Sequence, residues 1–326
     1  MNKNKLGIKD KFILFFLSNR ALLLDVIFFV FLSITSKQFL SIRNLTNVTR
    51  QISANTIIGI GYTFLLASGY VDLSVGAMLC MIGIIAGLLS QTTLPFVVIL
   101  IICILIGIFC GALNTIIGVK FNLPPFLVTL AMQQIYKAVM LLLSNGQSIP
   151  NLHEGIVFMG QGSIGQIPVC SLLMIILIVL GSILLTKTGF GRTVLVVGGN
   201  QEAARVSGIN VNFTRIKISM LLGALVAVTS FVSIGRVGAS QTSIGADTVM
   251  DVIAAVVIGG TPMGGGSGTV VGTLFGCLTI GLISNGLNLL QVSSYWQTFA
   301  KGVIILVAVI MDMYTEKIHD KLRNKE

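Results

Sequence analysis

Ten apolar stretches follow one another along this chain of 326 residues, and most of them approach the ~20 residues that a helix needs to cross a bilayer. Backbone groups inside lipid must be hydrogen-bonded within the protein, which favours helices for stretches of this length. We therefore expect an all-α, polytopic transmembrane helical bundle of about ten spans, or of eight or nine if some stretches are re-entrant. The stretches lie at residues 20–36, 52–68, 73–90, 95–119, 125–143, 169–186, 218–236, 249–261, 268–290 and 296–312.

Composition agrees with a surface that faces lipid. Hydrophobic residues make up 54% of the chain and charged residues only 10%, whereas a soluble domain carries roughly 25% charged residues. No polar linker divides the sequence, so residues 1–326 are expected to form a single transmembrane domain. No small-residue cleavage site follows the first apolar stretch before Lys37, which favours an uncleaved first span over a signal peptide.

The cations predict which side of the membrane each segment occupies. With ten spans and an inside N-terminus, fifteen of the 21 Lys and Arg residues fall in inside segments and only four in outside segments. Inside loops carry such an excess of Lys and Arg. The segments 1–19, 187–217 and 313–326 are therefore expected to be cytoplasmic. The net charge of +10 reflects this topology, and no basic run interleaved with aromatic residues indicates a nucleic-acid partner.

No residue pattern indicates covalent chemistry. The chain lacks a phosphate-binding loop, a Ser-His-Asp set and an H-E-x-x-H motif. Its five cysteines lie in or beside apolar stretches without a C-x-x-C pair, and its two histidines are isolated. We expect no catalytic residue, cofactor or metal, and hence no enzyme. A secondary carrier or channel stays open as an alternative, although paired intramembrane charges are not seen.

Two stretches are interrupted by glycine or proline, at Gly69–Gly76 and Gly259–Gly268. Irregular backbone at membrane depth, in corresponding halves of a chain, is typical of transporters built from inverted repeats. Spans 2–5 and 7–10 would run in opposite senses, as such a repeat requires. Asp72 is suited to cap a helix that starts near residue 73, and Lys137 and Lys301 are expected to snorkel toward the headgroups.

The loop 187–217 predicts a short helix at about residues 201–207. Asn200 suits its N-cap, Glu202 its first turn and Gly208 the position after its end. A short helix fenced by glycines on the cytoplasmic face is suited to docking another protein. A solvated connecting helix is the alternative that this loop alone leaves open.

A series of segments, spread in order along residues 40–312, forms one characteristic pattern. These segments are Asn44–Val48, Val71–Gly76, Thr129–Met132, Gly189–Arg192, Val197–Asn200, Ala203–Val211, Asp251 with Ile253–Thr261, Gly272–Thr273, Asn285–Leu290 and Val292–Ser294. The pattern resembles the ribose/xylose/arabinose/galactose-type permeases of bacterial ABC importers, and most of all ribose permeases. Tyr70, Val249 and Pro262 with Gly264–Gly266 depart from the usual family pattern.

The resemblance implies a permease in the bacterial inner membrane that imports a ribose-like monosaccharide by alternating access. Implied partners are a second permease chain (identical or related), two ABC ATPase subunits or one fused tandem ATPase, an extracytoplasmic sugar-binding protein and membrane lipid. Importers of autoinducer-2, nucleosides or branched-chain amino acids are the nearest alternatives.

Two sets of candidate site residues follow from the sequence patterns above, and the resemblance implies the role of the first. The first is a coupling helix that contacts the ATPase, formed by Asn200, Gln201, Glu202, Ala203, Ala204, Arg205, Ser207 and Gly208. The second lies on the translocation path or at helix breaks, and comprises Asn55, Gly69, Asp72, Ser74, Gly76, Gly260, Thr261, Asn285 and Asn288.

Overall fold

The structure is a computed structural model that describes residues 20–245, 248–304, 306–307 and 310. The expected cytoplasmic segments 1–19 and 313–326 lie outside these residues. Within the described residues every expected apolar stretch coincides with a helix, so the all-α prediction is confirmed. Residues 294–304 are also helical. The main helices are α2 (Arg20–Thr35), α3 (Ile42–Ala67), α4 (Val75–Ser90), α5 (Phe96–Lys120), α6 (Pro125–Ser144), α8 (Val169–Lys187), α11 (Val211–Val237), α12 (Thr248–Ile258) and α13 (Val270–Leu289).

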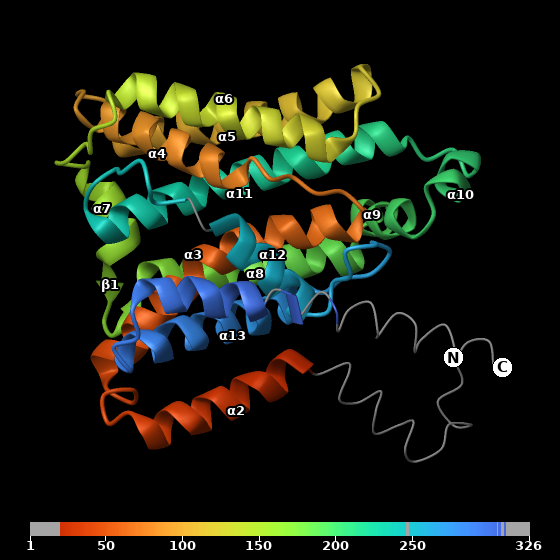
Figure 1. Ribbon diagram of the computed structural model, residues 1–326. Helices are drawn as coiled ribbons and strands as arrows, with labels where there is room; N and C mark the ends of the chain where they lie inside the picture. Colours follow the sequence, from red (N-terminus) through yellow and green to blue (C-terminus); the bar gives the residue numbers. More distant parts are fainter. Residues whose placement is uncertain (1–19, 246–247, 305, 308–309, 311–326) are drawn as a thin grey trace, which may run out of the picture.

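The long helices lie side by side and form a bundle with two distinct ends (Figure 1). One end carries the short helix α7 (Glu154–Gln161) and a hairpin of β1 (Ser163–Ile164) and β2 (Ile167–Pro168). The other end carries α9 (Gly189–Gly199) and α10 (Gln201–Val206). We call these the α7 end and the α10 end.

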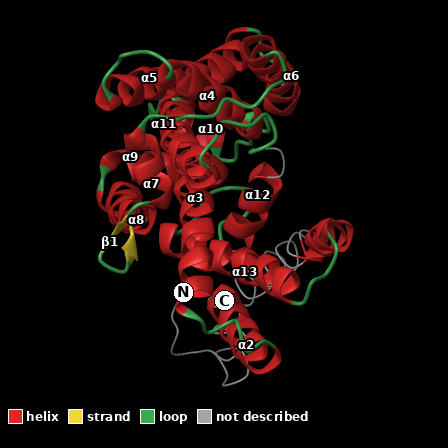
Figure 2. Cartoon of the chain, turned by 90° about the vertical axis from the view of Figure 1, so that its left-hand side faces the viewer, coloured by secondary structure: helices red, strands yellow, loops and turns green. Residues whose placement is uncertain are grey.

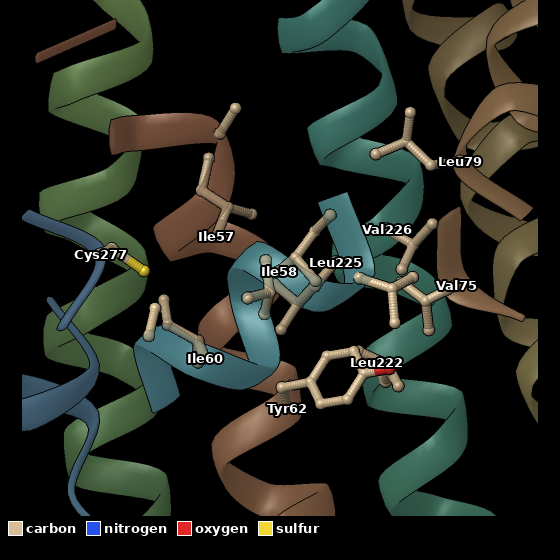
Figure 3. Packing of buried hydrophobic residues seen from close by; sticks show 14 of the residues in the cluster. Ile57, Ile58, Ile60, Tyr62, Val75, Leu79, Leu222, Leu225, Val226 and Cys277 are labelled. Atoms are coloured by element: carbon tan, nitrogen blue, oxygen red, sulfur yellow. The ribbon is translucent and has the colours of Figure 1, made fainter. Parts of the chain in front are cut away.

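The helices α3 and α11 form the centre of the bundle, and other helices surround them (Figure 2). Ile57 and Ile58 of α3 are fully buried, as are Leu222 and Val226 of α11, and Figure 3 shows them in one cluster. Glycines allow the closest approaches between helices. A Cβ atom added to Gly107 of α5 would clash with α11, because it would lie 2.2 Å from the carbonyl oxygen of Gly223. Small residues at such crossings let helix backbones approach closely in membranes.

The outer helices present aliphatic side chains to their surroundings. In the part of the chain that the structure describes, five helices, α5, α6, α8, α11 and α13, are long and apolar enough to cross a membrane. On α5 and α8 the exposed residues are mainly aliphatic or aromatic, including Ile101, Leu105, Phe109, Ile176 and Leu180. Because lipid tails are the solvent that accepts such a surface, the bundle is a multi-pass membrane protein.

The short helices α4 and α12 begin part-way along the bundle (Figure 1). With 16 and 11 residues, α4 and α12 are about 24 and 16 Å long, against a hydrocarbon core of about 30 Å. The non-helical segments 68–74 and 238–245 lead into them. The two starts are close together, since a Cβ on Gly76 would lie 2.5 Å from the Gly245 oxygen.

The pairing of the interruptions differs from the sequence prediction. The helices α3 and α11 are both long and run in opposite directions (Figure 1). Each is followed by a non-helical segment that leads back to the middle of the bundle and then by a short helix. The break at Gly69–Gly76 therefore corresponds to residues 238–245, and not to Gly259–Gly268. The latter segment is the turn between α12 and α13 at the α10 end, where Gly260, Gly265 and Gly266 have positive φ. Its glycines serve that turn.

Candidate functional site

The short helix α10 forms as the sequence predicts, with a cap at each end. The Asn200 side chain accepts a hydrogen bond from the Ala203 amide at 2.9 Å. At the other end the Gly208 amide donates to the Arg205 carbonyl and the Ile209 amide to the Ala204 carbonyl, each at 3.0 Å. Gly208 has φ +79°, the left-handed conformation that ends helices in this way. The helix is therefore short and rigidly bounded.

One face of α10 belongs to the chain itself. Ala204 is fully buried in a small cluster with Val197 and Val211, and Ile209 packs against it. The sequence interpretation that Ala204 contacts a partner is therefore wrong, because this side chain fixes α10 against α9 and α11. A tryptophan at this position would displace the helix from its own support, so it cannot report on docking alone.

The other face of α10 is free within the described chain. Glu202 and Arg205 form an exposed ion pair with each other at 2.9 Å, a surface pair of the kind that adds little stability. Val206, the last residue of the helix, is 89% exposed. Sequence reasoning omitted Val206, although an apolar residue between Arg205 and Ser207 on a glycine-bounded helix was the available signal. The remaining exposed members of the predicted set are Asn200, Ala203, Ser207 and Gly208.

Glycines connect the base of α10 to two other elements. A Cβ on Gly198, at the end of α9, would lie 1.8 Å from the Ala67 oxygen at the end of α3. The same Ala67 oxygen accepts a hydrogen bond from the Gly266 amide at 2.9 Å. A Cβ on Gly265 would lie 2.7 Å from the Gly69 nitrogen. We call Ala67, Gly69, Gly198, Gly265 and Gly266 the glycine junction. It joins α9, the α3–α4 break and the α12–α13 turn by direct backbone contact.

A buried polar network holds the α3–α4 break. Asp72 accepts hydrogen bonds from the Ser74 amide and hydroxyl at 2.8 and 2.6 Å through one oxygen. Its second oxygen accepts from the Asn114 amide group at 2.9 Å. Tyr136 of α6 donates to Asn114 at 2.7 Å, and Tyr62 donates to the Asp72 carbonyl. Asp72 thus caps the turn before α4, as the sequence indicates, and both carboxylate oxygens are already occupied within the chain.

The predicted path residues do not form one site. Asp72, Ser74 and Gly76 lie together at mid-depth, and half-buried Asn55 lies at the middle of α3. Gly69, Gly260 and Thr261 lie at the α10 end, where Thr261 is buried. The other two lie toward the α7 end of α13, where Asn285 pairs with Asn44 through two hydrogen bonds of 2.8 and 3.1 Å and Asn288 accepts one from Gln297.

The charged side chain of Lys301 does not lie as the sequence predicts. Lys301 does not snorkel freely, because its ammonium group lies 2.8 Å from the Asp251 carboxylate. Both side chains are largely buried, and a buried charge needs such a partner. The pair links α12 to the helix at 294–304. Among the described residues, no group of three His, Cys, Asp or Glu side chains could hold a metal, and all five cysteines are free thiols.

Comparison with known proteins identifies the class. The family described as the permease component of branched-chain amino acid transport systems matches residues 44–309. The chain belongs to this family of membrane-embedded transport permeases. It is a multi-pass inner-membrane protein.

The relatives narrow this class to the permeases that the sequence resembles. The ribose import permease of Bacillus subtilis is 38% identical over 290 residues, which cover 87% of this chain and 88% of the relative. That of Haemophilus influenzae is 34% identical and covers 92% and 94%. The xylose transport permease of Escherichia coli is 28% identical and covers 95% and 94%. The resemblance to permeases of bacterial ABC importers is thereby confirmed. No solved structure matches the chain.

Proposed function

We propose that this chain is the membrane-spanning subunit of an ATP-driven importer for a ribose-like monosaccharide. The observation that carries the proposal is its 38% identity to a ribose import permease over nearly the whole length of both chains. The fold supports it, because short helices that begin at mid-depth and internal halves of opposite direction are typical of transporters.

The α10 end faces the cytoplasm in this proposal. Six cations, more than at the α7 end, are found at or near it, namely Lys120, Lys187, Arg192, Arg205, Arg215 and Lys217. Cytoplasmic segments carry such an excess. The α7 end, with Lys37, Arg43, Arg50 and Arg236, is then extracytoplasmic and meets a sugar-loaded binding protein.

The exposed face of α10 docks on an ABC ATPase. Glu202, Ala203, Arg205, Val206 and Ser207 form this face, while Ala204 anchors the helix from behind. Val206 supplies apolar area for a groove on the partner, and the Glu202–Arg205 pair can exchange partners at its rim. Two ATPase subunits, or one tandem ATPase, would meet two permease chains.

The glycine junction transmits the motion of the ATPase. Because Gly198 touches the end of α3 and the α12–α13 turn backbone to backbone, a displacement of α10 and α9 cannot be absorbed by side chains there. It moves the α3–α4 break and the α12–α13 turn together. These elements border the place at mid-depth where the start of α4 contacts residue 245. There the solute path would open alternately to the two sides of the membrane.

The experiment is ATP hydrolysis by the assembled importer. The chain is reconstituted in liposomes with the ABC ATPase and the binding protein that we propose as its partners, and hydrolysis is measured with ribose, xylose or leucine present. Ribose should stimulate most. The family description also names branched-chain amino acid permeases, so stimulation by leucine alone would replace the sugar with that second candidate. Stimulation by none of the three would reject both.

A further inference from the structure

Three polar side chains lie near the middle of the membrane-spanning helix α6. Gln133, Gln134 and Lys137 are the ninth, tenth and thirteenth of its 20 residues. At 1.5 Å per residue, Gln134 lies about 14 Å from one end of the helix and 15 Å from the other. Gln134 and Lys137 are exposed and Gln133 is half-buried. We call these three residues the α6 polar face.

The α6 polar face points away from the bundle. Met132 and Tyr136, two residues before and after Gln134, are buried against the neighbouring helices. A separation of two residues on a helix is a rotation of about 200°, so Gln134 lies opposite them. Figures 1 and 2 show α6 at the edge of the bundle, where it packs against α4 and α5 on its inner side.

Lipid is a poor neighbour for this face. None of its three side chains has a hydrogen bond or ion pair with another described residue. An amide without a partner in a medium that cannot hydrogen-bond costs several kcal/mol, and polar residues inside membranes mark solute or ion pathways. The long stem of Lys137 could carry its charge toward the headgroups, but the shorter Gln134, at the centre of the helix, cannot reach them.

Hydrogen bonds to α5 fix the position of α6 in the bundle. On its inner side the Tyr136 hydroxyl donates to the Asn114 side chain at 2.7 Å and to the Cys110 carbonyl at 3.1 Å. Both acceptors belong to α5, and through Asn114 they connect to the Asp72 network. The position of the polar face is thus fixed relative to the α3–α4 break.

We infer that the α6 polar face borders a water-filled path and hydrogen-bonds the hydroxyl groups of a polar, uncharged solute. The chemistry fits, because glutamine both donates and accepts while lysine donates, as a polyol requires. An apolar amino-acid side chain would leave these groups unpaired. The naming of a hydroxylated solute rests on the proposed function, whereas the contact with water does not.

Cysteine labelling separates the possible neighbours of this face. Gln134→Cys and, as the matched control, Leu142→Cys, whose parent residue is 78% exposed on the same helix, are made in the full importer in membranes. Both are treated with a hydrophilic, membrane-impermeant methanethiosulfonate. Wild-type protein gives the background, since its five cysteines are buried. The hydrated thiolate attacks the reagent, forming a mixed disulfide and releasing methanesulfinate, so Gln134→Cys should react at least about tenfold faster than Leu142→Cys.

Two results would overturn the inference. Equal, slow labelling of both variants would place Gln134 in lipid. A slow Gln134→Cys that instead forms a disulfide with a second copy on oxidation would place it in a dry seam between chains. A second arm adds ribose, binding protein and ATP, which should slow labelling of Gln134→Cys. Fast labelling that ribose leaves unchanged would uphold the aqueous path and reject the hydroxylated solute, independently of docking at α10.

Discussion

Asn114 is the residue on which the polar network at the α3–α4 break depends. Its amide donates to Asp72 and to Ser74 at 2.9 and 2.8 Å, and its oxygen accepts from Tyr136. Asn114→Ala leaves a buried carboxylate and a buried hydroxyl without these partners. We expect a loss of about 1–3 kcal/mol or more of folding stability, measured as a lower melting temperature in detergent. Asn212→Ala, at an exposed position, is the control and should melt like the wild type.

Two glycines of α9 give opposite predictions for the same substitution. A Cβ on Gly198 would lie 1.8 Å from the Ala67 oxygen, whereas one on Gly189 would meet nothing within 4 Å. Gly198→Ala should therefore force the glycine junction apart and abolish uptake, while Gly189→Ala should transport normally. Uptake by membranes with matched permease content measures both. Normal uptake in Gly198→Ala would show that the junction does not transmit motion.

Local signals could be read from the sequence, whereas partners distant in the chain could not. Asn200 and Gly208 were predictable as caps, since each acts on backbone within a few residues of itself. The burial of Ala204 depends on Val197 and Val211, whose positions follow from the packing of three helices. The partners of Asp72 include Asn114, 42 residues away. No spacing in the sequence indicates that contact.

At the scale of elements, α10 is the proposed docking surface, and its exposed valine provides the test. Val206→Asp places a charge where we expect an apolar groove on the ATPase, so less ATPase should co-purify with the permease. The control is Ile164→Asp, which makes the same kind of change at an exposed position of the α7 end. Equal retention of the ATPase by both variants would remove α10 from the interface.

Helices were easier to predict than their depth. Apolar length locates α4 and α12 in the sequence, but their short lengths indicate half-spans only once their boundaries are known. Gly259–Gly268 holds six glycines and Gly69–Gly76 only two, yet the glycine-rich segment forms a turn at the α10 end. The true counterpart, residues 238–245, also holds two glycines, so glycine content does not identify the paired breaks. Its role follows from the fold of the two halves.

The whole molecule has two ends, and the account assigns them to opposite sides of the membrane. Gly155 lies on α7 and Asn200 lies just before α10, at opposite ends of the bundle. Reporter fusions at residues 155 and 200 should show an extracytoplasmic and a cytoplasmic location, respectively. The same location for both would contradict the number of spans between them, and the reverse assignment would contradict docking at α10.

The most direct test of the account is uptake of labelled ribose by liposomes that contain the permease with its ATPase and binding protein. We predict uptake that requires ATP on the α10 side and the binding protein on the α7 side, and that stops when any one of the three proteins is omitted. Uptake that persists without the ATPase would make this chain a secondary carrier and would contradict the account.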